Sequence, residues 1–128
     1  MQRKNISSGA PWEAQVGYSR AVRIGNIVEV SGTVAQKDGE IQGIGDPYEQ
    51  TRIIIQIIEK ALLEAGASLQ DVIRTRIFVK DMQHWPEIGR AHGEAFGEIR
   101  PASSMIQIQG LIDPDMLVEI EATAVITQ

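Results

Sequence analysis

Hydrophobic and polar residues alternate near the C-terminal end of the chain, between Leu117 and Val125. Because the side chains of a strand point to opposite faces in turn, this pattern predicts a strand with one largely apolar face. The other face carries two carboxylates, Glu119 and Glu121. Such a pair belongs either to a solvated sheet face or to the wall of a polar site. The choice between these two settings decides what can be said about function.

Two other segments have the spacing of apolar residues that is typical of an α-helix. The first is predicted to begin at a capping residue, Asp46, and to run to Ala65, where Gly66 stops it. Its apolar side chains cover a wide arc, which indicates a helix packed on more than one side. The second helix is predicted from about His84 to Ile99.

The remaining apolar segments favour strands, because they are rich in β-branched residues and are bounded by turn residues. These are two strands between Val22 and Gly32 joined at Gly25-Asn26, then Asp71–Lys80, Ser103–Gln109 and Leu117–Ile126, with an extra turn at Lys37–Glu40. The order strand-strand-helix-strand-helix-strand-strand predicts an α+β fold, with two helices on one face of a mixed sheet. The other face would need a partner, and a second copy of the chain fits that role.

The bulk properties predict one domain over residues 1–128 and exclude several kinds of protein. Hydrophobic residues make up 43% of the chain and charged residues 23%, as in soluble globular proteins. The net charge is −5 without a basic stripe, so nucleic-acid binding is not expected. No cysteine is present, which excludes disulfides and thiol nucleophiles and fits the cytoplasm. The sequence shows neither a signal peptide nor an apolar run that could span a membrane.

A set of short motifs, in this order along nearly the whole chain, resembles the RidA family, also called YjgF-like. The motifs are Gly17–Ala21, the hairpin ending at Val30-Ser31-Gly32, the helix closed by Gly66, Thr75–Asp81, Arg100-Pro101-Ala102 and Val118–Ala122. The resemblance implies a chorismate-mutase-like fold and a homotrimer whose sheets form a central barrel. It also implies small-molecule clefts at the subunit interfaces. Well-characterised members hydrolyse enamines and imines derived from amino acids to 2-keto acids and ammonia, without metal or cofactor.

The resemblance also assigns roles to individual residues. Tyr18 matches the tyrosine of the family's cleft, Ser31 the serine of its first hairpin, and Glu119 the glutamate that orients or activates water. The family's deaminases carry an arginine after the Pro-Ala motif, where it holds the carboxylate of the substrate. Here that position is Ser103, which offers one neutral donor instead of a bidentate cation.

Each candidate also has a structural interpretation. Arg90 could supply the missing cation, although an ordinary surface pair with Glu94 is the simpler expectation. Arg74 and Arg76 could bind an anion, or pair with Glu119 and Glu121 across the sheet, which we favour.

Two features of the second helix also allow either a structural or a functional interpretation. The stripe of Gly89, Gly93 and Gly97 indicates close packing between helices, or room for a ligand or a neighbouring subunit. His92 is expected to be structural, because His84 is too far along the chain to form a metal pair with it.

Three functions follow from the sequence. The first is a cytoplasmic, trimeric RidA-like hydrolase that deaminates a small molecule, which need not carry a free carboxylate. Tyr18, Ser31 and Ser103 would line the cleft, and Glu119 would place the water. The second is a non-catalytic ligand sensor or chaperone-like binder that uses the same cleft. The third, an endoribonuclease, is disfavoured by the acidic charge and by the lack of a histidine-based acid–base pair.

Overall fold

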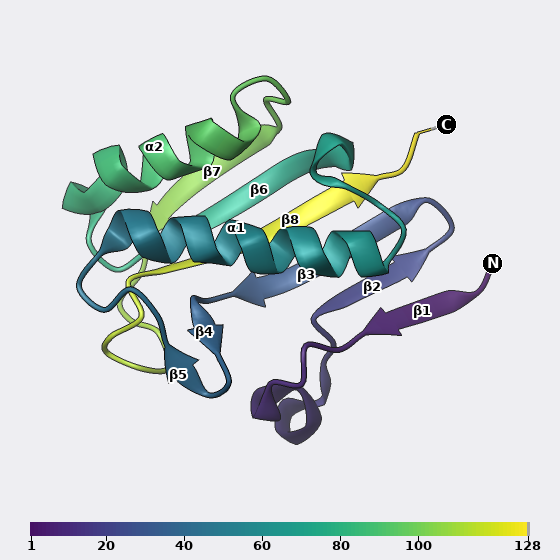
Figure 1. Ribbon diagram of the computed structural model, residues 1–128, viewed down its shortest axis with the longest axis horizontal. Coiled ribbons are helices and arrows are strands. Elements are labelled where there is room, and N and C mark those ends of the chain that lie inside the picture. Colours follow the sequence, from purple (N-terminus) through teal and green to yellow (C-terminus); the bar gives the residue numbers. More distant parts are fainter. Residues whose placement is uncertain (128) are drawn as a thin grey trace.

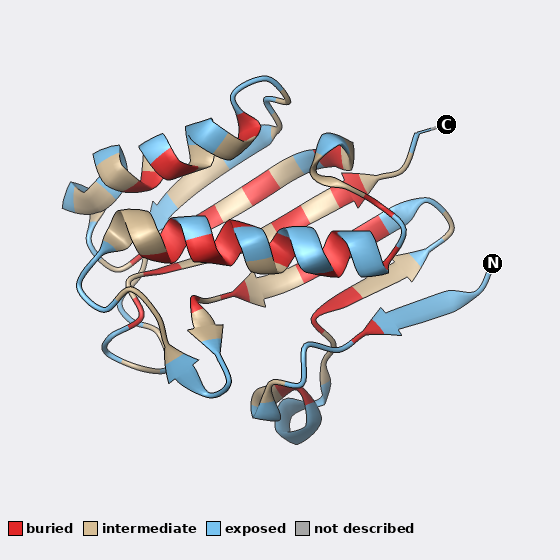
Figure 2. Ribbon diagram, viewed as in Figure 1, coloured by how far each residue is buried: buried red, intermediate tan, exposed pale blue. Residues whose placement is uncertain are grey.

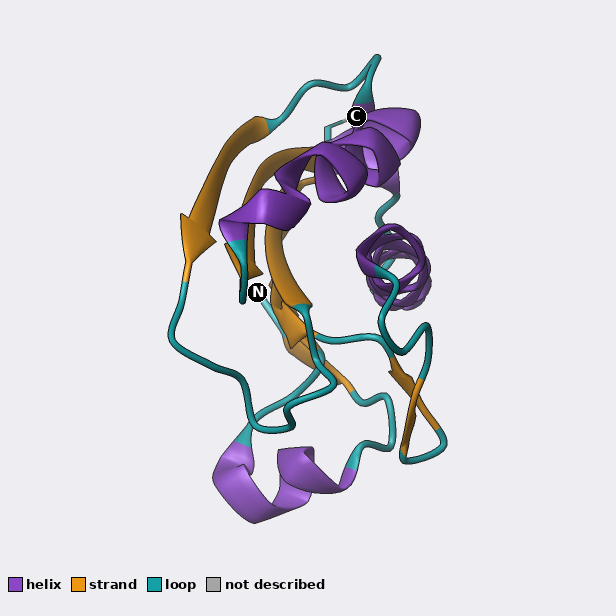
Figure 3. Ribbon diagram, turned by 90° about the vertical axis from the view of Figure 1, so that its left-hand side faces the viewer, coloured by secondary structure: helices purple, strands orange, loops and turns teal. Residues whose placement is uncertain are grey.

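The structure is a computed structural model that describes residues 1–127. A six-stranded sheet forms one layer and two helices form the other (Figure 1, Figure 3). The elements are β1 (Arg3–Ile6), a helical turn (Glu13–Gly17), β2 (Ala21–Ile24), β3 (Ile27–Thr33), β4 (Gln36–Lys37), β5 (Glu40–Ile41), α1 (Pro47–Glu64), β6 (Val72–Val79), α2 (Trp85–Phe96), β7 (Ala102–Gln107) and β8 (Val118–Val125).

The large sheet has the strand order β1-β2-β3-β8-β6-β7. Strands β6 and β7 run parallel, and every other pair in this sheet is antiparallel. The parallel pair is connected through α2, as a crossover requires. The predicted α+β architecture, a mixed sheet with two helices on one face, is therefore confirmed.

The core lies between the sheet and the helices, and it follows the alternation predicted for the last strand. Val118, Ile120, Ala122 and Ala124 of β8 are buried, whereas Glu119, Glu121 and Thr123 lie on the opposite face. Figure 2 shows the same alternation of buried and partly exposed residues along the central strands. The charged face of β8 is therefore the face that the helices do not cover.

Helix α1 forms where the sequence predicts it. Asp46 caps the helix by accepting a hydrogen bond from the Glu49 amide at 3.0 Å. Helix α2 is shorter than predicted, because it ends at Phe96 rather than Ile99. Arg100 has a φ of 56°, a left-handed conformation that turns the chain toward β7.

The sequence analysis missed β1 and the small β4–β5 hairpin. Strand β1 is exposed at three of its four positions, so it has no hydrophobic alternation to detect. Strands β4 and β5 have two residues each, although the turn between them was predicted at Lys37–Glu40. Asp38 and Gly39 have φ values of 53° and 80°, which is the geometry of a type I′ hairpin turn.

Replacing Gly66 with alanine is expected to lower the free energy of unfolding by about 1–2 kcal/mol. Gly66 has a φ of 90°, and a Cβ there would lie 2.5 Å from Nη1 of Arg23, which bonds the Ala65 carbonyl at the end of α1. Gly93→Ala is the matched control. It meets no atom within 4 Å and is expected to stabilise α2 by roughly 0.5–1 kcal/mol. Urea unfolding measures the free energy of unfolding of both variants. Equal changes in Gly66→Ala and Gly93→Ala would contradict this explanation.

No helix within residues 1–127 combines the length and the apolar character needed to cross a membrane.

Candidate functional site

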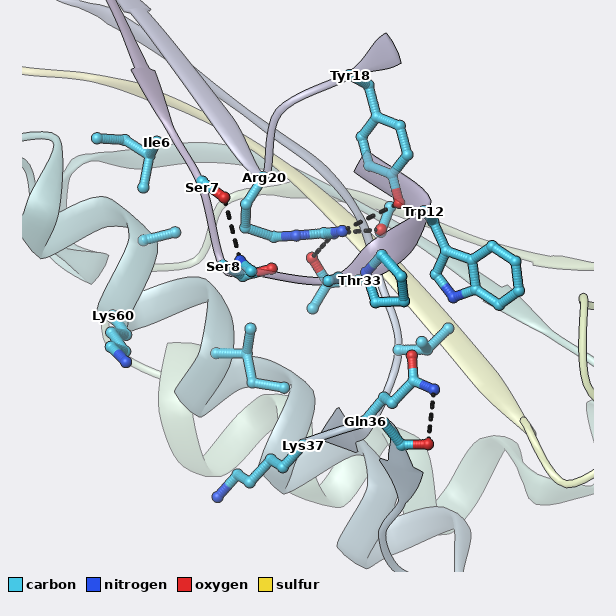
Figure 4. Close-up of a pocket in the computed structure, with 18 of the residues that line it drawn as sticks. Ile6, Ser7, Ser8, Trp12, Tyr18, Arg20, Thr33, Gln36, Lys37 and Lys60 are labelled. Atoms are coloured by element: carbon cyan, nitrogen blue, oxygen red, sulfur yellow. Dashed lines mark hydrogen bonds between the residues drawn. The ribbon is translucent and has the colours of Figure 1, made fainter. Parts of the chain in front are cut away.

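A cavity of about 1000 Å³ opens where the segment between β1 and β2 meets the end of β3 and one side of α1 (Figure 4). Among the charged and hydroxyl-bearing residues of its wall are three that the fold brings together from two distant segments. These are Tyr18 and Arg20 before β2, and Glu119 on β8. Two residues predicted for the site, Tyr18 and Glu119, therefore share one cavity.

Glu119 lies half-buried beside the irregular part of β3. The pairing of β3 with β8 shifts register between Val30 and Thr33, and Gly32 lies within this shift. A Cβ at Gly32 would be 2.7 Å from Oε1 of Glu119, so the carboxylate occupies space that only a glycine leaves free. The irregularity of β3 thus makes room for the carboxylate against the backbone.

Burial raises the pKa of Glu119 above its usual value. The nearby charge of Arg20 acts in the opposite direction, and Glu121 adds a smaller upward contribution. A carboxylate whose pKa is raised toward neutrality can take up and return a proton during a reaction. Glu119 is therefore the best-placed acid–base group of the cavity.

Arg20 is buried, with 7% of its surface exposed, and its guanidinium lies inside the cavity wall. Its Nη1 donates to the Gly32 carbonyl at 2.6 Å and to Oγ1 of Thr33 at 3.1 Å. Its Nη2 donates to the Tyr18 hydroxyl at 3.3 Å. Figure 4 shows the guanidinium directed at Tyr18 and Thr33. Arg20 thus ties the tyrosine to the irregular part of β3.

The charge of Arg20 is balanced by Glu13, which is also buried, with Nε of Arg20 3.7 Å from Oε2. Glu13 accepts hydrogen bonds from Ser7 and from the amide and hydroxyl of Ser8. Burial would raise the pKa of Glu13, but these hydrogen bonds and Arg20 outweigh burial, and the pKa is lowered. Glu13 therefore stays ionised and holds the segment between β1 and β2 in place.

Ser31 lies outside this cavity, beside a smaller hollow of about 340 Å³ on the face that the helices leave open. Its hydroxyl donates to the Ser19 carbonyl at 2.6 Å. The same hollow contains Arg76 and Glu121, which form the predicted cross-strand ion pair at 3.4 Å.

Arg74 departs from the expected pairing with a glutamate. Within residues 1–127 it forms no ion pair, and its Nη2 bonds the Ser104 hydroxyl at 3.4 Å instead. Glu119 is likewise free of an ion pair with Arg74 or Arg76 in the described chain. The cross-strand pairing is therefore confirmed only for Arg76 and Glu121.

Ser103 also lies apart from Glu119. It pairs in register with Thr75, and the two hydroxyls are 2.8 Å apart. Thr75 in turn lies 2.9 Å from Nε2 of His92, so Ser103 belongs to a chain of polar groups between β7, β6 and α2. Burial lowers the pKa of His92, and its ring packs against Phe96, as expected for a structural histidine. Because Thr75 is on the helix-covered face, Ser103 and Glu119 project from opposite faces of the sheet.

Arg90 is a further residue predicted for the site that lies away from the cavity. Arg90 is exposed, and its guanidinium lies over the ring of Tyr48, 4.0 Å from the centroid. The predicted pair with Glu94 is absent from the described residues, because Glu94 accepts a hydrogen bond from the Tyr48 hydroxyl instead. Arg90 is not among the residues that line the cavity.

The glycine stripe of α2 does not pack against another helix, which corrects the simpler of the two interpretations. A Cβ at Gly93 would meet no atom within 4 Å. Gly89 and Gly97 would meet only atoms of α2 itself, namely Trp85 and the Gly93 carbonyl. The stripe therefore faces open space.

Sequence reasoning missed Arg20 as a residue of the site, although a signal was present. Tyr18 is extended, and residues two apart in an extended segment point to the same side. The pair Tyr18 and Arg20 could therefore have been expected to act together. In the described part of the chain, no group of three or more histidine, aspartate or glutamate side chains is arranged to hold a metal ion.

The fold and the cavity together define a small α+β protein with a ligand-sized cleft around a half-buried glutamate. The sequence profile of the family described as Endoribonuclease L-PSP matches residues 8–126. The chain therefore belongs to this family, which is also known as the YjgF or RidA family.

Two relatives and one solved structure illustrate the family relationship. The uncharacterised protein SCO2049 of Streptomyces coelicolor is 40% identical over 121 residues, covering 94% of this chain and 90% of that protein. The 3-aminoacrylate deaminase RutC of Acinetobacter baylyi is 38% identical over 108 residues, covering 84% and 85%. The crystal structure of Rv2704 from Mycobacterium tuberculosis, a member of the YjgF/YER057c/UK114 family, superimposes with a TM-score of 0.89. It is 50% identical and covers 98% of this chain and 100% of that one. Such neighbours confirm the expected chorismate-mutase-like fold.

Proposed function

We propose that this protein is a cytoplasmic hydrolase that deaminates a small enamine or imine in the cleft around Glu119. One observation carries the proposal: Glu119 is half-buried, has a raised pKa and shares a cavity with Tyr18 and Arg20. Family membership supports the same reaction, because the relative from Acinetobacter baylyi is a 3-aminoacrylate deaminase.

The reaction needs one proton donor and one group that activates water. A proton from the solvent on the enamine carbon would give an iminium ion, and water would add to the C=N carbon. As ammonia leaves, the added hydroxyl would return one proton to the solvent and become the C=O of the carbonyl compound. Glu119 would take the proton from the attacking water and return it to the leaving nitrogen. Tyr18 would hold the substrate through its hydroxyl, which Arg20 fixes in place. No metal or cofactor is required by these steps.

The decisive experiment measures ammonia release by the purified protein from 3-aminoacrylate and from 2-aminoacrylate, each generated in the assay mixture. The expected result is a rate above the spontaneous reaction that is lost in Glu119→Gln. A rate equal to the spontaneous reaction, together with saturable binding of a stable analogue, would instead identify a non-catalytic ligand sensor or chaperone-like binder. The polar chain around Ser103 is the observation that favours this alternative, because that position holds no cation.

Ribonuclease activity is the third candidate, and we expect the protein neither to bind nor to cleave RNA at physiological salt. The chain carries a net charge of −5, whereas RNA binding depends mainly on cationic contacts to phosphates. Fluorescence anisotropy with a labelled RNA and gel assays of cleavage measure this. Cleavage that persists through several purification steps and disappears in a Glu119→Ala variant would contradict the expectation.

We further propose that the protein is a homotrimer whose subunits meet on the sheet face that the helices leave open, with the ligand clefts at the subunit interfaces. Ile27, Ile73 and Ile106, which flank or lie on this face, are 53%, 52% and 45% exposed in the single chain. Burial of such apolar surface favours association. Sedimentation equilibrium is expected to give three times the 14.1 kDa mass of one chain at micromolar concentration. A stable monomer would contradict both the trimer and any interfacial site.

A further inference from the structure

We propose that Arg20 is the cation with which this cleft binds a carboxylate of its ligand, so that the substrates are small carboxylates despite the serine at position 103. This inference rests on the proposed function of the same cleft, and it adds the class of substrate. Its support comes from the free hydrogen-bond donors of Arg20 and Tyr18, from the charges around the cavity, and from the positions of the other cations.

The first argument is the number of donors that remain free. A guanidinium has five N–H groups. The two on Nη1 are used by the Gly32 carbonyl and by Thr33, and Nη2 donates once, to the Tyr18 hydroxyl. One Nη2 hydrogen therefore remains. Because the Tyr18 oxygen accepts from Arg20, its own hydrogen is also free to be donated into the cavity.

These two free donors suit a carboxylate. The Arg20 Nη2 and the Tyr18 oxygen are 3.3 Å apart, so one donor can serve each oxygen of the same carboxylate, or both can serve one oxygen. Hydrogen bonds between a charged donor and a carboxylate are shorter and stronger than neutral ones. A neutral amide of the same shape lacks the charge and presents only one acceptor oxygen, so the pair would distinguish the two ligands.

The second argument concerns charge. Glu13 lies nearest to Nε of Arg20, and at 3.7 Å the contact is too long for a hydrogen bond. The carboxylate of Glu13 is satisfied mainly by Ser7 and Ser8. Arg20 is thus held in place, while its positive charge still acts on Glu119. A ligand carboxylate would find this charge in a setting that is already buried, where ionic hydrogen bonds are strengthened.

The third argument is that the other cations are poorly placed. Lys37 and Lys60 also line the cavity, but both are exposed, and Figure 4 shows them on the other side of the cavity from Tyr18. Arg90 lies outside the cavity, over Tyr48. Among the described residues that line the cavity, Arg20 is therefore the one buried cation.

The test compares two stable probes, crotonate and crotonamide, which differ only in the carboxylate. Crotonate has the shape of 3-aminoacrylate with a methyl group in place of the amine. Titrations followed by NMR give a dissociation constant for each probe. We expect the unmodified protein to prefer crotonate, and Arg20→Gln to weaken crotonate binding by about tenfold. Crotonamide binding should change by less than about twofold.

Further variants separate binding from folding. The double variant Glu13→Gln/Arg20→Gln should give the same loss of crotonate binding without leaving a buried carboxylate unpaired. Tyr18→Phe should weaken crotonate binding a few-fold, because it removes one donor and leaves the other contacts of Arg20 intact. Arg52→Gln is the matched control, because Arg52 is exposed on α1 and, within residues 1–127, pairs only with Glu49.

Three results would overturn the inference: no preference for crotonate in the unmodified protein, an equal loss of both probes in Arg20→Gln, or a selective loss in Arg90→Gln instead. Failure of the proposed function would look different. If the protein selects crotonate through Arg20 but releases no ammonia from any enamine, the carboxylate site stands and the hydrolase does not. If ammonia is released and Arg20→Gln keeps the preference for carboxylates, the hydrolase stands and the carboxylate site at Arg20 does not.

Discussion

Replacing Glu119 with glutamine should lower kcat for enamine hydrolysis by on the order of 10³-fold, the usual contribution of a positioned acid–base group. Glutamine keeps the size and hydrogen-bonding capacity of the side chain but cannot take up a proton from water. Glu119 lies against Gly32 with little free space, so a side chain of the same shape is needed to isolate this effect. The measurement is ammonia release at saturating substrate.

The binding of crotonate provides the control for this variant. It should be retained in Glu119→Gln, because Arg20 and Tyr18 are unchanged. Loss of binding together with activity would indicate a collapsed cleft rather than a missing base. A kcat within tenfold of the unmodified protein would show that another group activates the water.

The same residue sets the expected pH dependence. Because burial raises the pKa of Glu119, the base form is lost at a higher pH than for an exposed glutamate. The value of kcat/KM should therefore fall as the pH decreases through this raised pKa. Arg20 opposes the increase, so Arg20→Gln should move the fall to still higher pH, whereas Arg20→Lys should move it less. If the fall of kcat/KM at low pH occurs at the same pH in both variants as in the unmodified protein, the coupling between Arg20 and Glu119 is contradicted.

Replacing Gln50 with leucine should lower the free energy of unfolding by about 3 kcal/mol or more. Gln50 lies in α1 with no exposed surface. Its amide donates to the Gly43 carbonyl at 3.2 Å and to the Asp115 carbonyl at 2.9 Å, and its oxygen accepts from the Leu117 amide at 2.9 Å. Leucine fills the volume but leaves the Asp115 carbonyl and the Leu117 amide without their partner, whereas the Gly43 carbonyl still accepts from the Asp46 amide. Each loss of a partner costs roughly 1–3 kcal/mol when the group is buried.

Urea unfolding at a fixed protein concentration measures the effect of the Gln50 variant. Gln56→Leu is the matched control, because Gln56 is an exposed glutamine of the same helix and its replacement should stay within about 0.5 kcal/mol. Equal stability of the two variants would mean that water satisfies the loop carbonyls as well as Gln50 does. Because Leu117 immediately precedes β8, the Gln50 variant also tests how firmly the strand that carries Glu119 is anchored.

The sequence predicted the elements whose periodicity is strong. The two helices and the strand that became β6 have long apolar patterns, and β8 was found with its two faces correctly assigned. Strand β1 escaped detection because an exposed edge strand needs no apolar face. The end of α2 was placed three residues too late, since the helix ends at its C-cap Gly97 and a turn leads from there to the left-handed residue Arg100.

The candidate site was harder to predict, because it depends on pairing between distant segments. Tyr18 and Glu119 were found through the family resemblance, and both line the cavity. Ser103 was placed by its motif, but the direction of its side chain follows from the register of β7 with β6, which the sequence does not reveal. Arg20 was overlooked because a buried arginine is recognised only once its partners Glu13 and Thr33 are seen.

The contact of Glu13 with Arg20 makes the segment between β1 and β2 a wall of the cleft, so the order of this segment and the binding of a ligand are thermodynamically linked. Gly9 and Gly17, with φ values of 81° and 92°, lie within the segment, and the Glu13 carboxylate fastens it by accepting from the Ser7 hydroxyl and the Ser8 amide. A ligand held by Arg20 and Tyr18 therefore also stabilises the ordered arrangement of the segment. Occupancy of the cleft would accordingly be readable as slower amide hydrogen exchange near Glu13, far along the chain from Glu119.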